Sequence, residues 1–200
     1  MRSANDLGSA VLPVICFLLC VVSVPLTGGR LSALATFNPR QLWLVFAAIS
    51  MQVGIITLFP GNGRAYIGLH LASYALLLAF LMSNRRLPGL WITGLGTVMN
   101  FVAIAGNGGV MPATAGALRR AGRIIDPSQF ANSAHLVNPK FAFLGDVFAL
   151  PAEFPFANVF SAGDVCIVLG ALLTLHQVCG TRFFPPRQRL TPLQPLDGSA

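Results

Sequence analysis

Residues 65–83 read AYIGLHLASYALLLAFLMS, an apolar run without a charged side chain. The run is closed by the polar residues Asn84, Arg85 and Arg86. At a rise of about 1.5 Å per residue, a helix of this length crosses the hydrocarbon core of a bilayer. The stretch therefore predicts a transmembrane helix over residues 65–83.

The composition of the chain points to the same solvent. Of its 200 residues, 54% are hydrophobic and 10% are charged, and the mean hydropathy is +0.71. Soluble domains carry about 25% charged residues. We therefore expect a polytopic membrane protein rather than a soluble enzyme or a disulfide-stapled secreted module. The net charge of +7 does not predict nucleic-acid binding, because the basic residues lie in short segments between apolar runs, where they orient the chain.

Four further apolar runs complete the predicted architecture, an all-α bundle of about five transmembrane helices. A cleaved signal peptide is the alternative for the first run, but no small-residue cleavage site follows it. Ser161 to Asp164 fits a capping box that starts the last helix. The proline-rich end predicts a disordered cytoplasmic tail. The predicted spans are 7–26, 41–59, 65–83, 87–105 and 161–181, within a transmembrane domain of 1–182; the outer loop is 106–160 and the tail is 183–200.

Arginines in the short connections predict the orientation, because cytoplasmic loops are enriched in them. With the N-terminus outside and the C-terminus in the cytoplasm, most of these arginines fall on the cytoplasmic side. That side then holds Arg30, Arg40, Arg85, Arg86, Arg182, Arg187 and Arg189, and the short outer segments hold Arg2 and Arg64.

The loop over residues 106–160 is too long for a passive connector. Its many Phe, Leu and Val residues favour a cap that folds onto the helices. Met111 to Ile125 shows an amphipathic pattern, in which Arg119, Arg120 and Arg123 flank an apolar stripe. Such a helix is typical of the headgroup boundary, where guanidinium groups bind lipid phosphates.

Four motifs carry a resemblance to a family. They are Asn107-Gly108-Gly109-Val110-Met111-Pro112, His135, Leu144-Gly145-Asp146 followed by Leu150-Pro151, and Ser161-Ala162-Gly163-Asp164. Over about residues 90–175 the chain resembles a family of small bacterial integral-membrane proteins known only as a domain of unknown function. The sequence departs from the pattern at Phe148-Ala149, where the family leads us to expect a proline. The resemblance implies an architecture in the bacterial cytoplasmic membrane and a set of positions, but no reaction.

The motif residues define a candidate site on the outer face. Two carboxylates, an amide and an imidazole around one pocket suit acid–base work or the binding of a cation or a headgroup. Each also has a structural interpretation: a helix end at the glycines, a turn at Asp146 and a helix cap at Asp164. Catalytic candidates are Asp146, Asp164 and His135; binding candidates are Asn107, Gly108, Gly109, Arg119, Arg120 and Arg123.

Three polar residues in the predicted spans extend this candidate site. Gln52, His70 and Asn100 all lie roughly 9–12 Å below the outer boundary at the helical rise per residue. Polar side chains at such depth face other helices or a cavity. They either continue the outer site into the bundle or form hydrogen bonds between helices.

These features leave several functions open. The first is binding or modification of a membrane lipid or another amphiphile at the outer leaflet. The alternatives are a non-catalytic scaffold for a membrane-protein partner or a homo-oligomer, and a transporter component. No cofactor fingerprint occurs, so we expect no cofactor. The four cysteines lie in apolar runs and read as small apolar residues rather than metal ligands. Whether the protein is an enzyme stays open.

Overall fold

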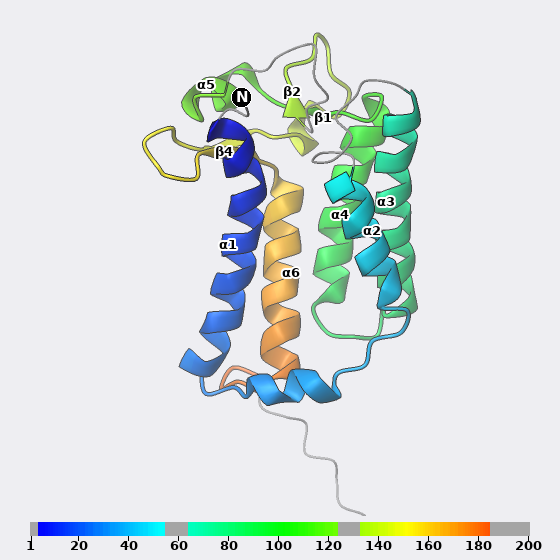
Figure 1. Cartoon of the computed structure of the whole chain (residues 1–200), viewed down its shortest axis with the longest axis vertical. Coiled ribbons are helices and arrows are strands. Elements are labelled where there is room, and N and C mark those ends of the chain that lie inside the picture. Colours follow the sequence, from blue (N-terminus) through cyan, green and yellow to red (C-terminus); the bar gives the residue numbers. More distant parts are fainter. Residues whose placement is uncertain (1–3, 55–63, 124–132, 185–200) are drawn as a thin grey trace, which may run out of the picture.

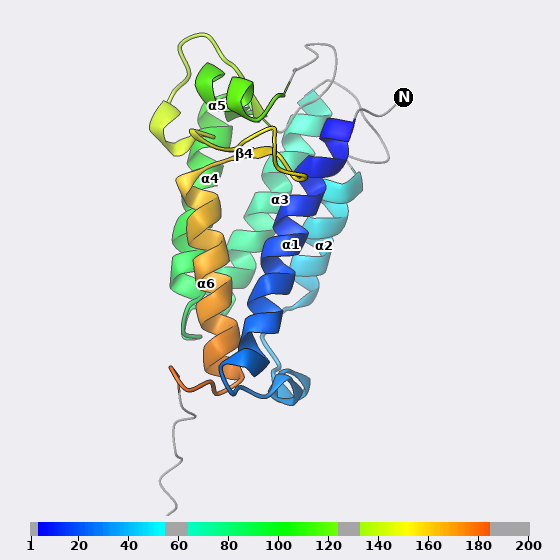
Figure 2. The same ribbon diagram turned by 90° about the vertical axis from the view of Figure 1, so that its left-hand side faces the viewer.

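The computed structural model describes residues 4–54, 64–123 and 133–184, with side chains from residue 12 on and excluding that of Arg64. The fold is mostly helical, as predicted. The five longest of its helices run side by side along the long axis (Figures 1 and 2). They are α1 (Ala4–Leu26), α2 (Trp43–Val53), α3 (Arg64–Ser83), α4 (Leu90–Gly106) and α6 (Ala162–Val178).

Helix α4 lies at the centre of the bundle. It packs against α6 on one side and α3 on the other, α1 packs on α6, and α2 packs on α3. The chain of packing contacts therefore runs α1, α6, α4, α3, α2. Figure 1 shows α1, α6 and α4 from left to right, with α2 and α3 to the right of α4. Helices α2, α3 and α4 pack in sequence order, whereas α6, the last helix of the chain, packs between α1 and α4.

The contact between α4 and α6 is a backbone contact. A Cβ atom on Gly96 of α4 would overlap the carbonyl oxygen of Gly163 on α6. Likewise, a Cβ atom on Gly170 would overlap Thr93, and one on Gly89 would lie 2.7 Å from the Thr174 nitrogen. Small residues that let two helices approach this closely are typical of helix pairs in membranes.

The described part of the chain between α4 and α6 packs over one end of the bundle, and we call it the cap. In the cap, β1 (Met111–Pro112) pairs in parallel with β2 (Ser133–Ala134), and β3 (Phe148–Leu150) pairs antiparallel with β4 (Asn158–Phe160). The short helices α5 (Ala115–Arg120) and η3 (Ala142–Leu144) complete it. A small core holds it together, formed by Ala113, Ala117, Leu118, Ala121 and Val159.

Two sequence predictions need correction in the cap. The all-α prediction omitted these two strand pairs. The amphipathic helix predicted over Met111–Ile125 is also too long, because only α5 is helical. Met111 and Pro112 belong to β1, and Thr114 caps α5. Gly122 follows α5 with a φ of 62°, which a continuing right-handed helix does not allow. Ile125 lies outside the described residues.

The 3₁₀ helix η1 (Leu31–Thr36) lies at the opposite end of the bundle, where polar contacts join α1 to the end of α6. The buried His176 ring contacts the Ser23 hydroxyl of α1 at 2.9 Å through Nε2 and the Thr181 hydroxyl at 3.2 Å through Nδ1. The Arg30 amide donates to the Cys179 carbonyl at 2.9 Å. These contacts join α1 to the end of α6.

Helix lengths agree only in part with the predicted spans. Among the described residues, Ala65–Ser83 is the one stretch both long and apolar enough to cross a membrane, and 22% of its apolar window is buried inside the bundle. The other apolar stretches are shorter: Leu12–Leu26, Trp43–Val53, Leu90–Gly106 and Ala162–Val178. Five spans therefore remain a prediction. The predicted second span extends into residues 55–59, outside the described residues, as does the predicted tail beyond residue 184.

The α4–α6 contact leads to a stability prediction. Gly96→Ala should destabilise the protein by about 1–3 kcal/mol, as overpacking typically does, because its Cβ atom meets the α6 backbone. Gly94→Ala, two residues away on α4, is the matched control, since its Cβ atom meets nothing within 4 Å. It should be neutral or stabilising. Thermal unfolding in detergent measures both, and equal melting temperatures would contradict the proposed backbone contact.

Candidate functional site

The N-terminus of α6 is closed by a capping box, which confirms the predicted one. The Asp164 amide donates to the Ser161 hydroxyl oxygen at 3.0 Å, and the Ser161 amide donates to Asp164 Oδ2 at 2.8 Å. Both bonds satisfy amides that the first helical turn leaves unpaired. The Asp164 carboxylate is therefore fixed at the point where the cap enters α6.

Asn100 of α4 joins this helix end to the centre of the bundle. Its side chain is 3% exposed, and its amide donates to Asp164 Oδ1 at 2.7 Å. The Ser161 hydroxyl donates to Asn100 Oδ1 at 2.9 Å. Gly163 leaves room for the Asn100 side chain, because a Cβ atom at position 163 would overlap Asn100 Oδ1. We call Asn100, Ser161 and Asp164 the helix-end cluster.

A row of polar residues on α2 and α3 leads up to the helix-end cluster. The side-chain amide of Gln52 donates to the Ser73 hydroxyl at 3.1 Å, and that hydroxyl donates to the backbone carbonyl of His70 at 2.7 Å. The rings of His70 and Tyr74 stack with centroids 5.5 Å apart, and Tyr74 is in hydrogen-bonding contact with Asn100. The predicted trio of Gln52, His70 and Asn100 thus lies in one continuous row, linked by two residues that sequence reasoning missed.

Asp146 holds the two halves of the cap together. Its backbone amide donates to the Pro112 carbonyl at 2.8 Å, and its carbonyl accepts from the Thr114 amide at 3.1 Å. Its side chain is 4% exposed and accepts a hydrogen bond from the Ser133 hydroxyl. Gly145 allows the approach, because a Cβ atom there would overlap the Pro112 carbonyl. Ser133 is a third residue that the sequence did not predict.

The surroundings of Asp146 change its acidity. Burial raises the pKa of its carboxyl to about 6, since a buried carboxylate loses hydration. The Ser133 hydrogen bond opposes this shift, the charge of Asp164 adds to it, and the charge of Arg123 opposes it. The two carboxyls of the candidate site are thus close enough to interact, and Asp146 exchanges its proton near neutral pH.

The three predicted arginines have different surroundings. Arg119 and Arg120 are exposed in the last turn of α5. Arg123 turns inward, and its Nη1 donates to Oδ1 of the buried Asn158 at 2.7 Å. Asn158 Oδ1 also accepts from the Val159 amide at 3.0 Å. Only Arg123 of the three is therefore linked to the interior of the cap.

Asn107, Gly108 and Gly109 hold the backbone at the end of α4. The side-chain amide of Asn107 donates through Nδ2 to the Lys140 carbonyl at 2.7 Å, and the backbone amide of Lys140 donates to Asn107 Oδ1 at 2.9 Å. Gly108 and Gly109 have φ values of 68° and 91°, and the Gly109 amide caps α4 through the Ile104 carbonyl at 2.8 Å. Positive φ angles are readily adopted by glycine alone, so this motif turns the chain from α4 into the cap.

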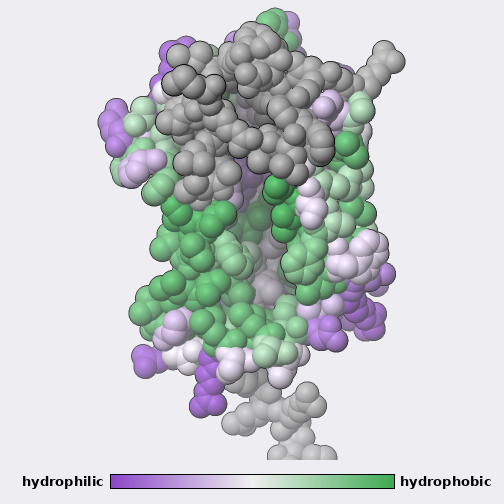
Figure 3. Space-filling view, in the orientation of Figure 1, coloured by the Kyte–Doolittle hydropathy of each residue, from purple (hydrophilic) through white to green (hydrophobic). Residues whose placement is uncertain are grey.

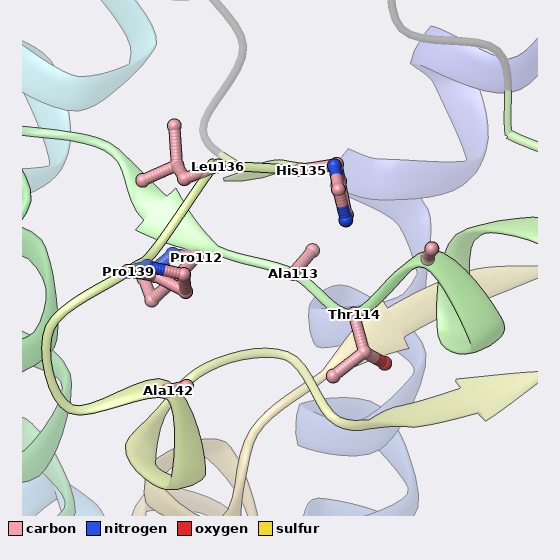
Figure 4. A pocket seen from close by; sticks show the side chains of 8 residues that line it. Pro112, Ala113, Thr114, His135, Leu136, Pro139 and Ala142 are labelled. Carbon is pink, nitrogen blue, oxygen red and sulfur yellow. The ribbon is translucent and has the colours of Figure 1, made fainter.

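His135 lies on the surface of the cap, whereas Asp146 is buried. It is exposed and lines a pocket of about 200 Å³ on the cap surface (Figure 4). Leu136 comes from the same segment after β2, and Pro139 and Ala142 come from the segment that leads into η3. Asp146 lies outside the described lining of this pocket. In the described part of the chain, Asp164 is hydrogen-bonded to Asn100 and its charge acts on Asp146, and His135 is not among these partners.

The fold and the site together define a class of protein: a mostly helical bundle that carries a cap and a row of polar residues at one end. The family model for a family of unknown function (DUF5317) matches residues 36–176. The chain belongs to this family. A search of curated proteins and a search of solved structures found no significant match. The matched region runs from the end of η1 to the last turn of α6, so it contains the whole candidate site.

The pKa of Asp146 leads to a pH prediction. Because its folded-state pKa lies above the usual carboxyl value, the folded state binds this proton more tightly than the unfolded state. That stabilisation is complete at about pH 4 and is lost as the pH rises through about 6. The melting temperature in detergent should fall over this range, and Asp146→Asn should remove this part of the fall.

Ser133→Ala is the companion variant. It removes the hydrogen bond that lowers the pKa of Asp146, so the pH at which stability is lost should move upward. An unchanged pH profile in Asp146→Asn would show that another group is responsible for the titration.

Proposed function

We propose that the protein is an integral protein of the bacterial cytoplasmic membrane, in which α1, α2, α3, α4 and α6 all cross the bilayer. Large apolar side chains face outward on every one of these helices. Figure 3 shows hydrophobic residues over the middle of the bundle and hydrophilic ones gathered toward its two ends. Examples, one per helix in chain order, are Phe17, Phe46, Leu69, Trp91 and Leu169, which are 55%, 63%, 46%, 65% and 47% exposed.

The short helices are compatible with this placement. Helices α4 and α6 have 17 residues each, which is at the lower limit for a span. The described part of α2 has 11 residues, and the apolar run in the sequence continues to Phe59. Neither Asp, Glu, Lys nor Arg interrupts the described part of α2 or α4.

The positions of the arginines support an outer cap. Arg30 and Arg40 flank η1, Arg85 and Arg86 lie between α3 and α4, and Arg182 follows α6. All of these connections lie at the end opposite the cap (Figure 1). Since cytoplasmic loops are enriched in arginine, the cap and the N-terminus face outward and the C-terminus faces the cytoplasm.

Reporter fusions test this topology. Alkaline phosphatase, which is active only outside the cytoplasm, should be active when fused after Val137 in the cap and inactive when fused after Arg189. Immunoblots that show equal amounts of both fusions are the control. The reverse activity pattern would place the cap in the cytoplasm and refute the orientation.

We further propose that the outer end binds the polar head of a lipid or another amphiphile. The observation that carries this proposal is the polar row from Gln52 to Asp164, which is half-buried at its two ends and buried at His70, Ser73 and Asn100, together with the buried Asp146 in the cap. Polar and ionisable groups within membrane bundles are costly and are usually functional. A carboxyl with a pKa of about 6 beside a second carboxyl suits a cationic head group or proton transfer to a bound group.

A non-catalytic scaffold is the second candidate, and one observation favours it. The helix-end cluster satisfies its own hydrogen bonds, because Asn100, Ser161 and Asp164 bond to one another. Such a cluster stabilises the junction of cap and bundle whether or not a ligand binds. The partner would then be another membrane protein or a second copy of the chain. A transporter component stays a weaker alternative, since five short helices enclose little space.

Native mass spectrometry of the detergent-purified protein distinguishes binding from scaffolding. The wild type should retain a lipid or amphiphile adduct, and Asp146→Asn should lose it without a lower melting temperature at neutral pH. Glu153→Gln is the matched control, because Glu153 is an exposed acid of the cap and its change should leave the adduct intact.

Asp164→Asn separates the two interpretations of the helix-end cluster. As a cap alone, the change should cost about 0.5–1 kcal/mol of stability and leave the adduct in place. As part of the binding site, it should also abolish the adduct. Full retention in both Asn variants would reject the shared site and favour the scaffold.

A further inference from the structure

Four exposed phenylalanines of the cap lie in two segments that the proposed site does not use. Phe141 and Phe143, at η3, are 47% and 72% exposed. Phe154 and Phe156, in the connection between β3 and β4, are 55% and 37% exposed. Clustered exposed apolar side chains of this size mark interaction surfaces.

The two segments project sideways at the lower edge of the cap. In Figure 1 the β3–β4 connection extends outward beside the top of α1, and in Figure 2 η3 extends outward beside the top of α4. Helix α5 and the segment after β2 lie higher in both views. The phenylalanine segments therefore lie at the level where the bundle helices end.

The η3 segment is fixed in place rather than loosely attached. Phe141 has a φ of 52° and lies in the left-handed region, which is a costly conformation for a bulky residue. The Asn107–Lys140 hydrogen bonds hold the chain immediately before it to the end of α4. The Phe141 ring also packs on Gly106, where a Cβ atom would lie 3.1 Å from its Cδ2. This strained turn presents Phe143 outward.

The β3–β4 connection is equally well ordered by hydrogen bonds. The Phe154 amide donates to the Pro151 carbonyl at 3.0 Å, and the Ala157 amide donates to the Phe154 carbonyl at 3.2 Å. The Ala152 amide donates to the Arg120 carbonyl at 2.9 Å, which ties the connection to α5. At its base, the rings of Phe148 and Phe160 stack with centroids 5.5 Å apart.

We propose that these phenylalanines insert into the outer surface of the bilayer and seat the cap on it. This inference rests on the membrane location proposed above. The two segments project from different sides of the bundle (Figures 1 and 2). A protein partner would have to cover two sides of the bundle to contact both, whereas a bilayer surrounds the bundle on all sides.

Charge and continuity favour the bilayer as the occupant. Lys140 precedes Phe141, and Arg119 and Arg120 lie on α5, which the β3–β4 connection contacts. Apolar rings next to basic side chains are typical of segments that lie in the headgroup region of anionic membranes. The exposed Val165 and Leu169 of α6 continue the apolar surface below the cap. Glu153 is the acid that lies within these segments.

Single-tryptophan variants in lipid vesicles test this inference. In a Trp43→Phe, Trp91→Phe background, tryptophan is placed in the cap by Phe143→Trp or Phe154→Trp. Val137→Trp is the cap control, because Val137 is 87% exposed in the higher segment after β2. Phe46→Trp on α2 reports on the bundle. The vesicles contain phosphatidylcholine and phosphatidylglycerol with bromine, a fluorescence quencher, at shallow or deep positions of the acyl chains.

Shallow bromine should quench the two phenylalanine-site reporters at least about twofold more strongly than Val137→Trp, as expected for rings in the headgroup boundary. Deep bromine should quench Phe46→Trp most. If the cap reporters are quenched no more than Val137→Trp while Phe46→Trp is quenched, the cap does not insert and this inference is overturned. If Phe46→Trp also escapes quenching, the membrane location fails first, and the inference falls with it.

Discussion

The backbone contact between α4 and α6 determines the arrangement of the rest of the molecule. The cap begins where α4 ends and finishes where α6 begins, so the distance between these two helices sets how the cap closes. Gly96 and Gly163 allow their backbones to meet, and Gly163 also leaves the space that Asn100 needs to reach Asp164. In the membrane location proposed above, where helices lack a hydrophobic driving force for association, such close packing and interhelical hydrogen bonds would hold the helices together.

The cap depends on a second constraint, the burial of Asp146. Its backbone pairs with Pro112 of β1 and with Thr114, two residues after β1, and its side chain accepts from Ser133 at the start of β2. One residue thus joins three segments that are distant in sequence. The same burial raises the pKa of its carboxyl to about 6, so the residue that organises the cap is also the group best suited to exchange a proton there.

Local signals in the sequence predicted local structure well. Hydropathy located the long helices, and the spacing of Ser161 and Asp164 predicted the capping box, because both depend on residues close in the chain. The pairing of α4 with α6 depends on contacts between residues that the whole cap separates in sequence, and no local pattern encodes such contacts. Ser73 and Tyr74 were missed for a related reason. They lie one turn from His70 and link it to Gln52 and Asn100, but their role appears only once the helices are placed together.

The motif residues divide into two groups with different physical roles. Asn107, Gly108 and Gly109 turn and hold the backbone, and their contacts account for why those residue types are needed. The carboxyls are different, because Asp146 and Asp164 raise each other's energy when both are charged. A cap that served only to cover the bundle would be more stable with a neutral amide at position 146, which forms a turn equally well. The cost of this buried carboxyl is therefore the strongest physical argument that the junction of cap and bundle binds a ligand.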